Sequence, residues 1–437
     1  MPWTELEQRV NEADTIKVSG KVCQVIGLLI ESTGPSAAVG DICEICLPNR
    51  KKIACEVVGF HSDRLLLMPF ERVHGIRPGL KVINTESCLK VPVGEGLIGR
   101  ILDGLGKPID GKGPLKVEGY YPLNREAPNP FERRRIRKQL VLGVRAIDGL
   151  LSIGRGQRIG IFSGSGLGKS TLIGMMTRYT SAPVIVLGLV GERGREVREF
   201  IEKDLGPEGL KRAVVVVSTS DKTALSRVKA AYTATSIAEY FRDQGKDVLL
   251  MMDSITRFAL SLREIGLAVG EPPTTKGFPP SVFATLPQLL ERTGSSRKGS
   301  ITAFYAVLVE GDDLDEPVSD AVRGILDGHI VLSRKLSHEN HYPAVDVLQS
   351  VSRLAIEISS KEHRELREEF VETYATYRSN EDLIKIGAYN QGSDPKIDKS
   401  INQIENFNLF LKQPVSESAR FKDTMEMLKR VTGGGEK

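Results

Sequence analysis

The stretch "IFSGSGLGKST", Ile161 to Thr171, decides how this sequence is interpreted. Glycines alternate through it and a Lys-Ser pair follows, a pattern in which backbone N–H groups converge on a phosphate and the lysine balances its charge. The apolar run "RIGIFSG" precedes the loop and the helix-like segment "KSTLIGMMTRYT" follows it. This strand, loop and helix are the context that a phosphate site requires.

One position departs from the usual loop pattern, which has a glycine five residues before Gly168. This chain has Ser163 there, at the end of the expected strand, where a small residue can serve. The spacing G-x-G-x-G, rather than G-x-G-x-x-G, argues against a dinucleotide fold. We therefore expect phosphates on the loop, with a charge from Lys169 and a hydroxyl for Mg²⁺ from Ser170. The expected nucleotide-binding residues are Ser163, Gly164, Ser165, Gly166, Leu167, Gly168, Lys169, Ser170 and Thr171.

Two carboxylates are expected at the same edge of a sheet as the loop. Asp253 ends the apolar run "DVLLMMD", so it is a candidate for holding the metal, and a buried structural aspartate is the alternative. Glu192 follows "VIVLGLVG" and is the candidate catalytic carboxylate for the attacking water. The alternative for Glu192 is that it only begins the charged helix "GREVREFIEKDL", a description that Glu196 and Glu199 fit better.

The pattern around the loop indicates a doubly wound α/β domain. Between about residues 158 and 333, uninterrupted apolar runs such as "AVVVVST" and "SITAFYAVLVEG" alternate with helical stretches, as in a parallel sheet buried on both faces. We expect this domain to span residues 94–358. Residues 16–93 are short Val- and Ile-rich runs broken by Gly and Pro, typical of a small β-barrel. Residues 359–437 are polar and helical, and residues 1–15 suggest a short amphipathic helix.

Composition narrows the class of protein. The chain has 437 residues, a net charge of +4 and 40% hydrophobic residues, which is ordinary for a soluble globular protein. The polar, acidic start argues against a signal peptide, and the longest apolar run is too short to span a bilayer, so we expect a cytoplasmic protein. Cys43 and Cys46 form a C-x-x-C, but no second pair or spaced histidine accompanies it, so all the cysteines are expected to be reduced and structural. His338 and His341 also lack further ligands.

At this point the residues resemble a known family. "GSGLGKST", "VGERGREVREF", "DSITRFALSLREIGLAVGEPPTTKGFPPSVFATLPQLLERTG" and "HYPAVDVLQSVSR" are similar to the ATPases of type III protein export. These ATPases drive assembly of the bacterial flagellum or of virulence injectisomes, and they are related to the catalytic subunit of rotary ATP synthases. The resemblance covers nearly the whole chain and implies a RecA-like P-loop ATPase core with an N-terminal small β-barrel and a C-terminal helical domain.

The resemblance also implies roles for single residues. Lys169 and Ser170 match the phosphate-loop lysine and Mg²⁺ ligand, Glu192 the catalytic glutamate and Asp253 the second acidic motif. Arg193 and Arg257 match arginines near the phosphates. Tyr342 matches an aromatic residue that stacks on adenine. Arg353 matches an arginine that reaches into the neighbouring subunit's site, because family members assemble as homohexamers with Mg-ATP at the interfaces.

Partners follow from the same resemblance. It implies a central stalk protein, export substrates and their chaperones, a regulator or stator bound through the N-terminal helix, and association with a membrane export gate at the inner face of the cell membrane. The region "IGAYNQGSDPKIDKSINQ" lacks the acidic lever of ATP synthase catalytic subunits, which favours the export branch. "TGPSAAVGDIC" and "GIRPG" favour the flagellar system.

Three alternatives remain open. They are a virulence export ATPase, a rotary ATPase subunit for ion transport and a hexameric nucleic-acid translocase. The last is disfavoured, because the barrel region has only Phe60 and Phe70 as aromatics for base stacking, and the charge bias is weak. We therefore expect no specific nucleic-acid partner.

Overall fold

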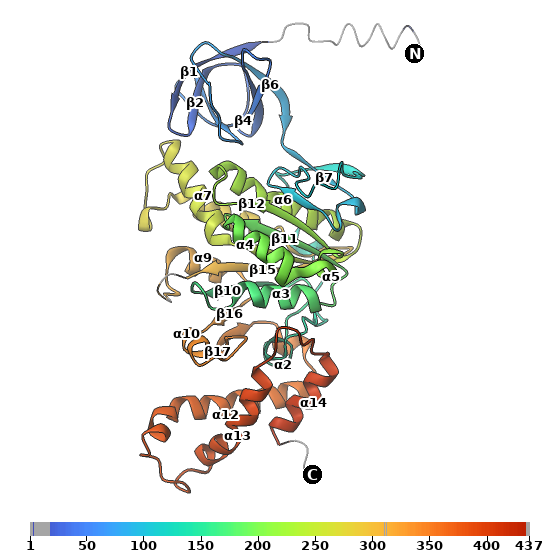
Figure 1. The fold of residues 1–437 in the computed structure, drawn as a ribbon, viewed down its shortest axis with the longest axis vertical. Helices are drawn as coiled ribbons and strands as arrows, with labels where there is room; N and C mark the ends of the chain where they lie inside the picture. The colour runs from blue at the N-terminus through green and yellow to red at the C-terminus, as the bar shows by residue number, and fades with distance from the viewer. Residues whose placement is uncertain (1–2, 4–17, 310, 312, 434–437) are drawn as a thin grey trace. The chain divides into compact units, whose positions relative to one another are not determined.

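The computed structural model describes residue 3 and residues 18–433, except 310 and 312. The chain divides into two compact units, one of Met1–Leu89 with Ile265–Pro272 and the other of Lys90–Glu264 with Pro273–Lys437. Figure 1 follows the chain from its N-terminus in blue to its C-terminus in red. The helix expected over residues 1–15 lies outside the described residues, apart from Trp3. No helix in the described part of the chain is long and apolar enough to cross a membrane.

The first unit is a closed six-stranded barrel, as the sequence predicted. Alternate side chains of its strands, among them Val22, Ile45 and Leu67, point inward and form its apolar core. The strands follow the order β1-β2-β5-β4-β3-β6 around the barrel. Their bounds are β1 (Ser19–Ile26), β2 (Leu29–Thr33), β3 (Asp41–Cys46), β4 (Lys52–His61), β5 (Arg64–Pro69) and β6 (Lys81–Cys88).

The barrel cysteines are free, as expected. Cys43 on β3 lies opposite Cys55 on β4, and both side chains are fully buried. Burial, with a smaller contribution from Asp41, raises the pKa of the Cys43 thiol to about 11, so it stays a neutral apolar group at neutral pH. Among the described residues, no three His, Cys, Asp or Glu side chains gather to hold a metal ion.

The second unit is built on a mostly parallel sheet with the order β17-β16-β10-β15-β13-β11-β12-β8, and β14 pairs with β15. β17 and β14 are antiparallel to their neighbours. Every residue of β11 and β12 is buried, which confirms the expectation of strands covered on both faces. The bounds are β8 (Ile101–Asp103), β10 (Arg158–Ser163), β11 (Val184–Val190), β12 (Ala213–Ser218), β13 (Asp247–Asp253), β14 (Gly294–Ser295), β15 (Ser300–Leu308), β16 (Gly328–Leu332) and β17 (Val345–Ser352).

A small two-stranded sheet stands apart from the large one. β7 (Lys90–Val93) pairs with β9 (Gly119–Pro122), and both belong to the second unit. The sequence pattern placed residues up to 93 in the barrel region, whereas the described barrel strands end with β6 at Cys88. The four residues of β7 continue the same Val-rich pattern, so only their pairing distinguishes them.

Four helices, α6, α10, α12 and α13, begin at a residue whose side chain accepts a backbone N–H of the first turn. Thr223 accepts the amide of Ser226 at the start of α6, and Ser360 accepts that of His363 at the start of α12. The α-helices are α2 (Arg145–Leu150), α3 (Lys169–Tyr179), α4 (Gly194–Glu199), α5 (Gly206–Leu210), α6 (Ala224–Asp243), α7 (Ile255–Ala268), α8 (Pro280–Leu290), α9 (Pro317–Ile325), α10 (Arg334–His338), α11 (Ala355–Ile358), α12 (Lys361–Lys385), α13 (Pro395–Leu411) and α14 (Phe421–Val431). A π-helix, η3 (Phe200–Leu205), continues α4.

The C-terminal helices α12, α13 and α14 share the apolar core of the ATPase sheet. The Phe370 ring on α12 packs on Phe407 and Phe410 of α13, with centroids 4.2 and 5.5 Å apart. These rings belong to one continuous cluster with Ile147 and Leu150 of α2. Burying three phenylalanine side chains stabilises this contact by several kcal/mol, at about 1.5–3 kcal/mol each. The helical domain that the sequence predicted is therefore packed on the nucleotide-binding core.

Candidate nucleotide site

The loop between β10 and α3 has the backbone shape that a bound anion needs. Gly166 and Gly168 have φ of 79° and 85°, values that side-chain-bearing residues rarely adopt, so these glycines are required by conformation. Ser163 is the last residue of β10 and pairs with Leu308 and Leu332 in regular parallel register. It therefore has ordinary strand geometry, which explains physically why a serine fits where the usual pattern has glycine.

Lys169 and Asp253 meet at the carboxyl ends of their strands. Lys169 begins α3 after the glycine loop that follows β10, and Asp253 ends β13. The Lys169 Nζ forms an ion pair with Asp253 Oδ1, and both side chains are largely shielded from solvent. The two residues are 84 positions apart in sequence, and the strand β15 lies between their strands in the sheet.

Glu192 belongs to the same charged cluster. It follows β11, whose Leu189 is in register with Asp253 on β13. Burial is the main cause that raises the pKa of Glu192 above its ordinary value, and the Asp253 carboxylate raises it further, whereas Lys169 and Arg257 oppose the shift. Perturbed carboxylates of this kind concentrate at functional sites, because a base or orienter needs a pKa matched to its task.

The two flanking arginines differ in their surroundings. Arg257, on α7, is half-buried and packs on Gly191, where an added Cβ would come within 2.8 Å of the Arg257 Cβ. Arg193 is exposed, and its Nη1 lies 3.4 Å from Glu196 Oε1. In this structure only Arg257 is therefore held beside Glu192, and Arg193 must turn away from Glu196 to meet a phosphate.

Tyr342 lies over the glycine-rich loop. A Cβ built on Gly168 would be 3.5 Å from the Tyr342 Cε1, so the ring is in contact range of the loop. Its hydroxyl is 2.9 Å from Ser337 Oγ, and the side chain is 41% exposed. An aromatic ring that is well placed and still accessible is suited to stacking on a nucleobase.

Arg353 lies at the opposite edge of the sheet from the loop. It follows β17, and its amide donates to the Asp327 carbonyl, next to the first residue of β16. β16 runs parallel to β10, and its other end, at Leu332, is the one beside Ser163. The exposed Arg353 side chain is thus separated from its own chain's charged cluster by the length of a strand.

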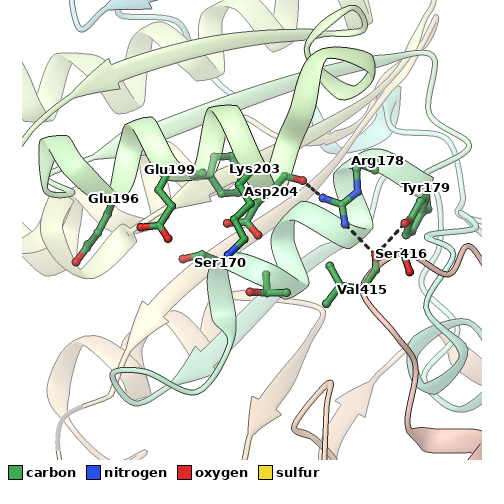
Figure 2. A pocket seen from close by; sticks show the side chains of 11 residues that line it. Ser170, Arg178, Tyr179, Glu196, Glu199, Lys203, Asp204, Val415 and Ser416 are labelled. Carbon is green, nitrogen blue, oxygen red and sulfur yellow. Dashed lines mark hydrogen bonds between the residues drawn. The ribbon is translucent and has the colours of Figure 1, made fainter.

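A cavity of about 800 Å³ opens beside the loop. Figure 2 shows Ser170 on one side, Glu196, Glu199, Lys203 and Asp204 above it, and Val415 with Ser416 on the far side. Its volume is in the range of small-molecule sites, about 300–1,000 Å³. The cavity lies next to Ser170 and Thr171 in the first turn of α3, so it can receive the part of a nucleotide beyond its phosphates.

Sequence analysis missed the residues that close this cavity, namely Arg178, Tyr179, Val415 and Ser416. Pro414 indicates that a helix has ended, but no motif connects a loop at residue 415 with a helix more than 230 positions earlier. The connection depends on main-chain carbonyls, which every residue type carries. A sequence pattern has no signal for such contacts.

Three parts of the chain match models of protein families. Residues 143–352 match the nucleotide-binding domain of the ATP synthase alpha/beta family. Residues 22–86 match the beta-barrel domain of the same family. Residues 359–430 match the T3SS EscN ATPase C-terminal domain. The last match separates this chain from ATP synthase subunits at its C-terminal end.

Individual relatives agree with this division. The chain is 54% identical to the flagellum-specific ATP synthase of Bacillus subtilis, covering 98% of both chains. It is 48% identical to the type 3 secretion system ATPase of Xanthomonas euvesicatoria, covering 98% of this chain and 97% of the relative. The solved structure of the assembled ATPase EscN from the enteropathogenic E. coli type III secretion system is 47% identical and matches with a TM-score of 0.90, over 94% of this chain and 100% of that one. A second structure, EscN in complex with its central stalk EscO, matches with a TM-score of 0.88 over the same shares, at 46% identity. The chain therefore belongs to the family of flagellum-specific ATP synthases and type 3 secretion system ATPases.

Proposed function

We propose that this protein hydrolyses Mg-ATP to energise export of flagellar proteins through a type III secretion apparatus. The observation that carries the proposal is the gathering of Lys169, Asp253 and Glu192 at one edge of a parallel sheet, beside a glycine loop. That edge, outside the carboxyl ends of the strands, is where open α/β sheets bind ligands. Family membership supplies the class of reaction.

Two orphaned polar atoms support a bound phosphate and metal at this edge. In the described chain, Ser163 Oγ and Arg257 Nε are buried and have no hydrogen-bond partner. Buried polar groups normally find a partner, so an unpaired group next to a loop of this shape is suited to a ligand. Ser170 and Asp253 offer a hydroxyl and a carboxylate, the hard oxygen ligands that Mg²⁺ prefers. When bound, Mg²⁺ would neutralise charge that develops on the phosphates.

The protein's own side chains divide the remaining work. Lys169 leaves its ion pair with Asp253 and binds the terminal phosphates. Glu192, whose pKa burial raises above its ordinary value, holds and orients the attacking water and, when ionised, accepts its proton. Arg257, and Arg193 once it leaves Glu196, stabilise negative charge on the transferred group. Tyr342 stacks on adenine beyond Gly168.

A second copy of the chain completes the site. Arg353 is exposed and lies at the far edge of its own sheet, so it has no role in its own cluster. An arginine supplied by a neighbour would act on the phosphates bound there. We therefore infer a homohexamer whose catalytic sites lie at subunit interfaces. The assembled state of the related EscN supports this arrangement.

One further partner is supported by the same relatives. The EscN–EscO complex supports a central stalk protein as a partner. Export substrates with their chaperones, a regulator bound through residues 1–15 and a membrane export gate complete the proposal, which places the protein in the cytoplasm at the inner face of the membrane. The flagellar system is favoured over a virulence system because the identity to the flagellar relative of B. subtilis is 54%, against 48% for the type 3 secretion relative of X. euvesicatoria.

An ATPase assay over a protein concentration series tests the proposal. Wild-type specific activity should rise with concentration, because sites form at interfaces, and Glu192→Gln should abolish it. Glu202→Gln is the matched control, since Glu202 is an exposed glutamate on η3 that pairs with Arg198 and does not line the cavity. Activity that is independent of concentration, or that survives Glu192→Gln, would contradict the assignment. Hydrolysis stimulated by RNA would favour a nucleic-acid translocase instead.

A further inference from the structure

The C-terminal end of α3 joins three segments that are distant in sequence. Arg178 lies in the last turn of this helix, whose first turn carries Lys169 and Ser170. Its Nη1 donates to the main-chain carbonyl of Asp204 on η3, and its Nη2 donates to the carbonyl of Val415 at 3.0 Å. Figure 2 shows this bridge at the end of the cavity away from Ser170. A single guanidinium thus holds the nucleotide-binding helix, η3 and the loop between α13 and α14.

Tyr179 strengthens the same contact. Its hydroxyl donates to the Val415 carbonyl at 2.8 Å, so this one oxygen accepts hydrogen bonds from two neighbouring side chains. The Arg178 guanidinium lies over the Tyr179 ring, 5.2 Å from its centroid. Stacking on an aromatic face restricts the guanidinium and keeps its donors directed at the two carbonyls.

The other end of the loop is held by Gln413, which is 3% exposed. Its Nε2 donates to the carbonyls of Gly143 and Glu417, each at 2.8 Å. The backbone N–H of Gln413 donates to the carbonyl of Tyr342 at 3.0 Å. The loop of residues 413–417 is therefore attached through Gln413 to Tyr342, which covers the glycine loop. It is attached through the Val415 carbonyl to α3.

These attachments position one wall of the cavity. Ser170 and Thr171 line the side where the phosphates bind, whereas Val415 and Ser416 line the far side. A nucleotide whose phosphates occupy the glycine loop has its nucleoside end directed to the space that remains. The position of the Val415 wall then decides how well that end fits, but has no direct effect on the phosphates.

We propose that Arg178, assisted by Tyr179, is a positioning residue that holds the Val415–Ser416 wall against the nucleotide-binding helix and thereby sets affinity for the nucleoside end of ATP. The inference rests on the proposed ATPase function. It also gives the C-terminal helices a direct connection with the nucleotide, because the wall belongs to the segment between α13 and α14. Coupling between ligand binding at this wall and the position of the helices would act equally in both directions.

Binding of ATP and of inorganic tripolyphosphate, each with Mg²⁺, separates this role from a general structural one. Arg178→Ala should weaken ATP binding and raise its KM about tenfold, the effect of losing a charge-assisted hydrogen bond. Tyr179→Phe, which removes one hydroxyl, should raise KM about threefold. In both variants tripolyphosphate affinity and kcat should stay within about twofold of wild type, because neither variant touches the phosphate side.

Control variants make the result specific. Arg198→Ala removes an exposed arginine of α4 that pairs with Glu202 and does not touch the loop, so its ATP affinity should equal that of wild type. Arg178→Lys, which keeps the charge but cannot bridge two carbonyls, should fall between wild type and Arg178→Ala. Hydrogen exchange at residues 415–417 should accelerate in Arg178→Ala.

The outcomes are distinct. Equal loss of ATP and tripolyphosphate binding would overturn the inference and show that Arg178 only stabilises the fold. Unchanged ATP affinity in both Arg178→Ala and Tyr179→Phe would also overturn it. Failure of the proposed function would instead be seen in the wild type, which would not hydrolyse ATP.

Discussion

Replacing Gly143 with alanine should destabilise the second unit by about 2–5 kcal/mol. Gly143 has a φ of 76°, and a left-handed conformation costs a side-chain-bearing residue about 1–2 kcal/mol. The added Cβ would lie 2.4 Å from the Tyr179 Cβ, an atom next to the main chain that cannot move aside. Overpacking of this kind costs about 1–3 kcal/mol more, and the two contributions add to the range given.

Gly387→Ala is the matched control, because it isolates the backbone contribution. Gly387 has a φ of 72°, but no atom lies within 4 Å of its added Cβ. It should lose about 1–2 kcal/mol only. Urea unfolding followed by circular dichroism measures both variants, and the excess in Gly143→Ala should be about 1–3 kcal/mol. Equal destabilisation of the two variants would refute the close approach of Gly143 and Tyr179.

Three further predictions concern the site and its surroundings. Arg353→Ala should lower kcat by about 10³–10⁵ without changing the monomer's circular dichroism, and mixing it with Lys169→Ala should restore activity at mixed interfaces; no recovery on mixing would count against a shared site. Because Glu192 has a raised pKa and must be ionised, kcat should fall as pH decreases through that pKa. Arg257→Gln removes a cation that lowers this pKa, so the acid limb of its kcat–pH profile should move to higher pH, and a move to lower pH would contradict the arrangement. Burial lowers the pKa of His341 to about 4 from 6.5, so the unfolded chain binds the proton more tightly and stability falls as pH decreases between those values. His341→Met should remove about 2 kcal/mol of the loss in unfolding free energy between about pH 7.5 and about pH 5, as urea unfolding at the two pH values would show.

Most elements of the fold could be predicted from sequence because their signals are local. The glycine loop, the apolar run before it and the helix after it are contiguous, and the structure has β10 and α3 there. The order of strands could not be read in this way. β15 lies between β10 and β13, although more than 40 residues separate it from either in the chain, and only tertiary packing decides that position.

The candidate site was predictable to a similar extent. Lys169 and Asp253 are recognisable because each has a chemical type and a place at a strand end, and the structure pairs them. The position of Arg353 at the opposite edge follows from β16 and β17, an antiparallel pair whose register no local pattern specifies. The contact of Arg178 with the Val415 carbonyl was unpredictable, because its acceptor is common to all residues.

The ion pair between Lys169 and Asp253 has a consequence for the timing of turnover. The lysine already pairs with an anion, so phosphates bound at the proposed site would replace that partner rather than meet a free cation. The displaced carboxylate becomes available to the metal that accompanies the nucleotide. After hydrolysis Asp253 would compete with the product for the same ammonium group. The pair would therefore weaken binding of any phosphate ligand to the lysine, and a ligand that leaves would be replaced by a carboxylate already in place.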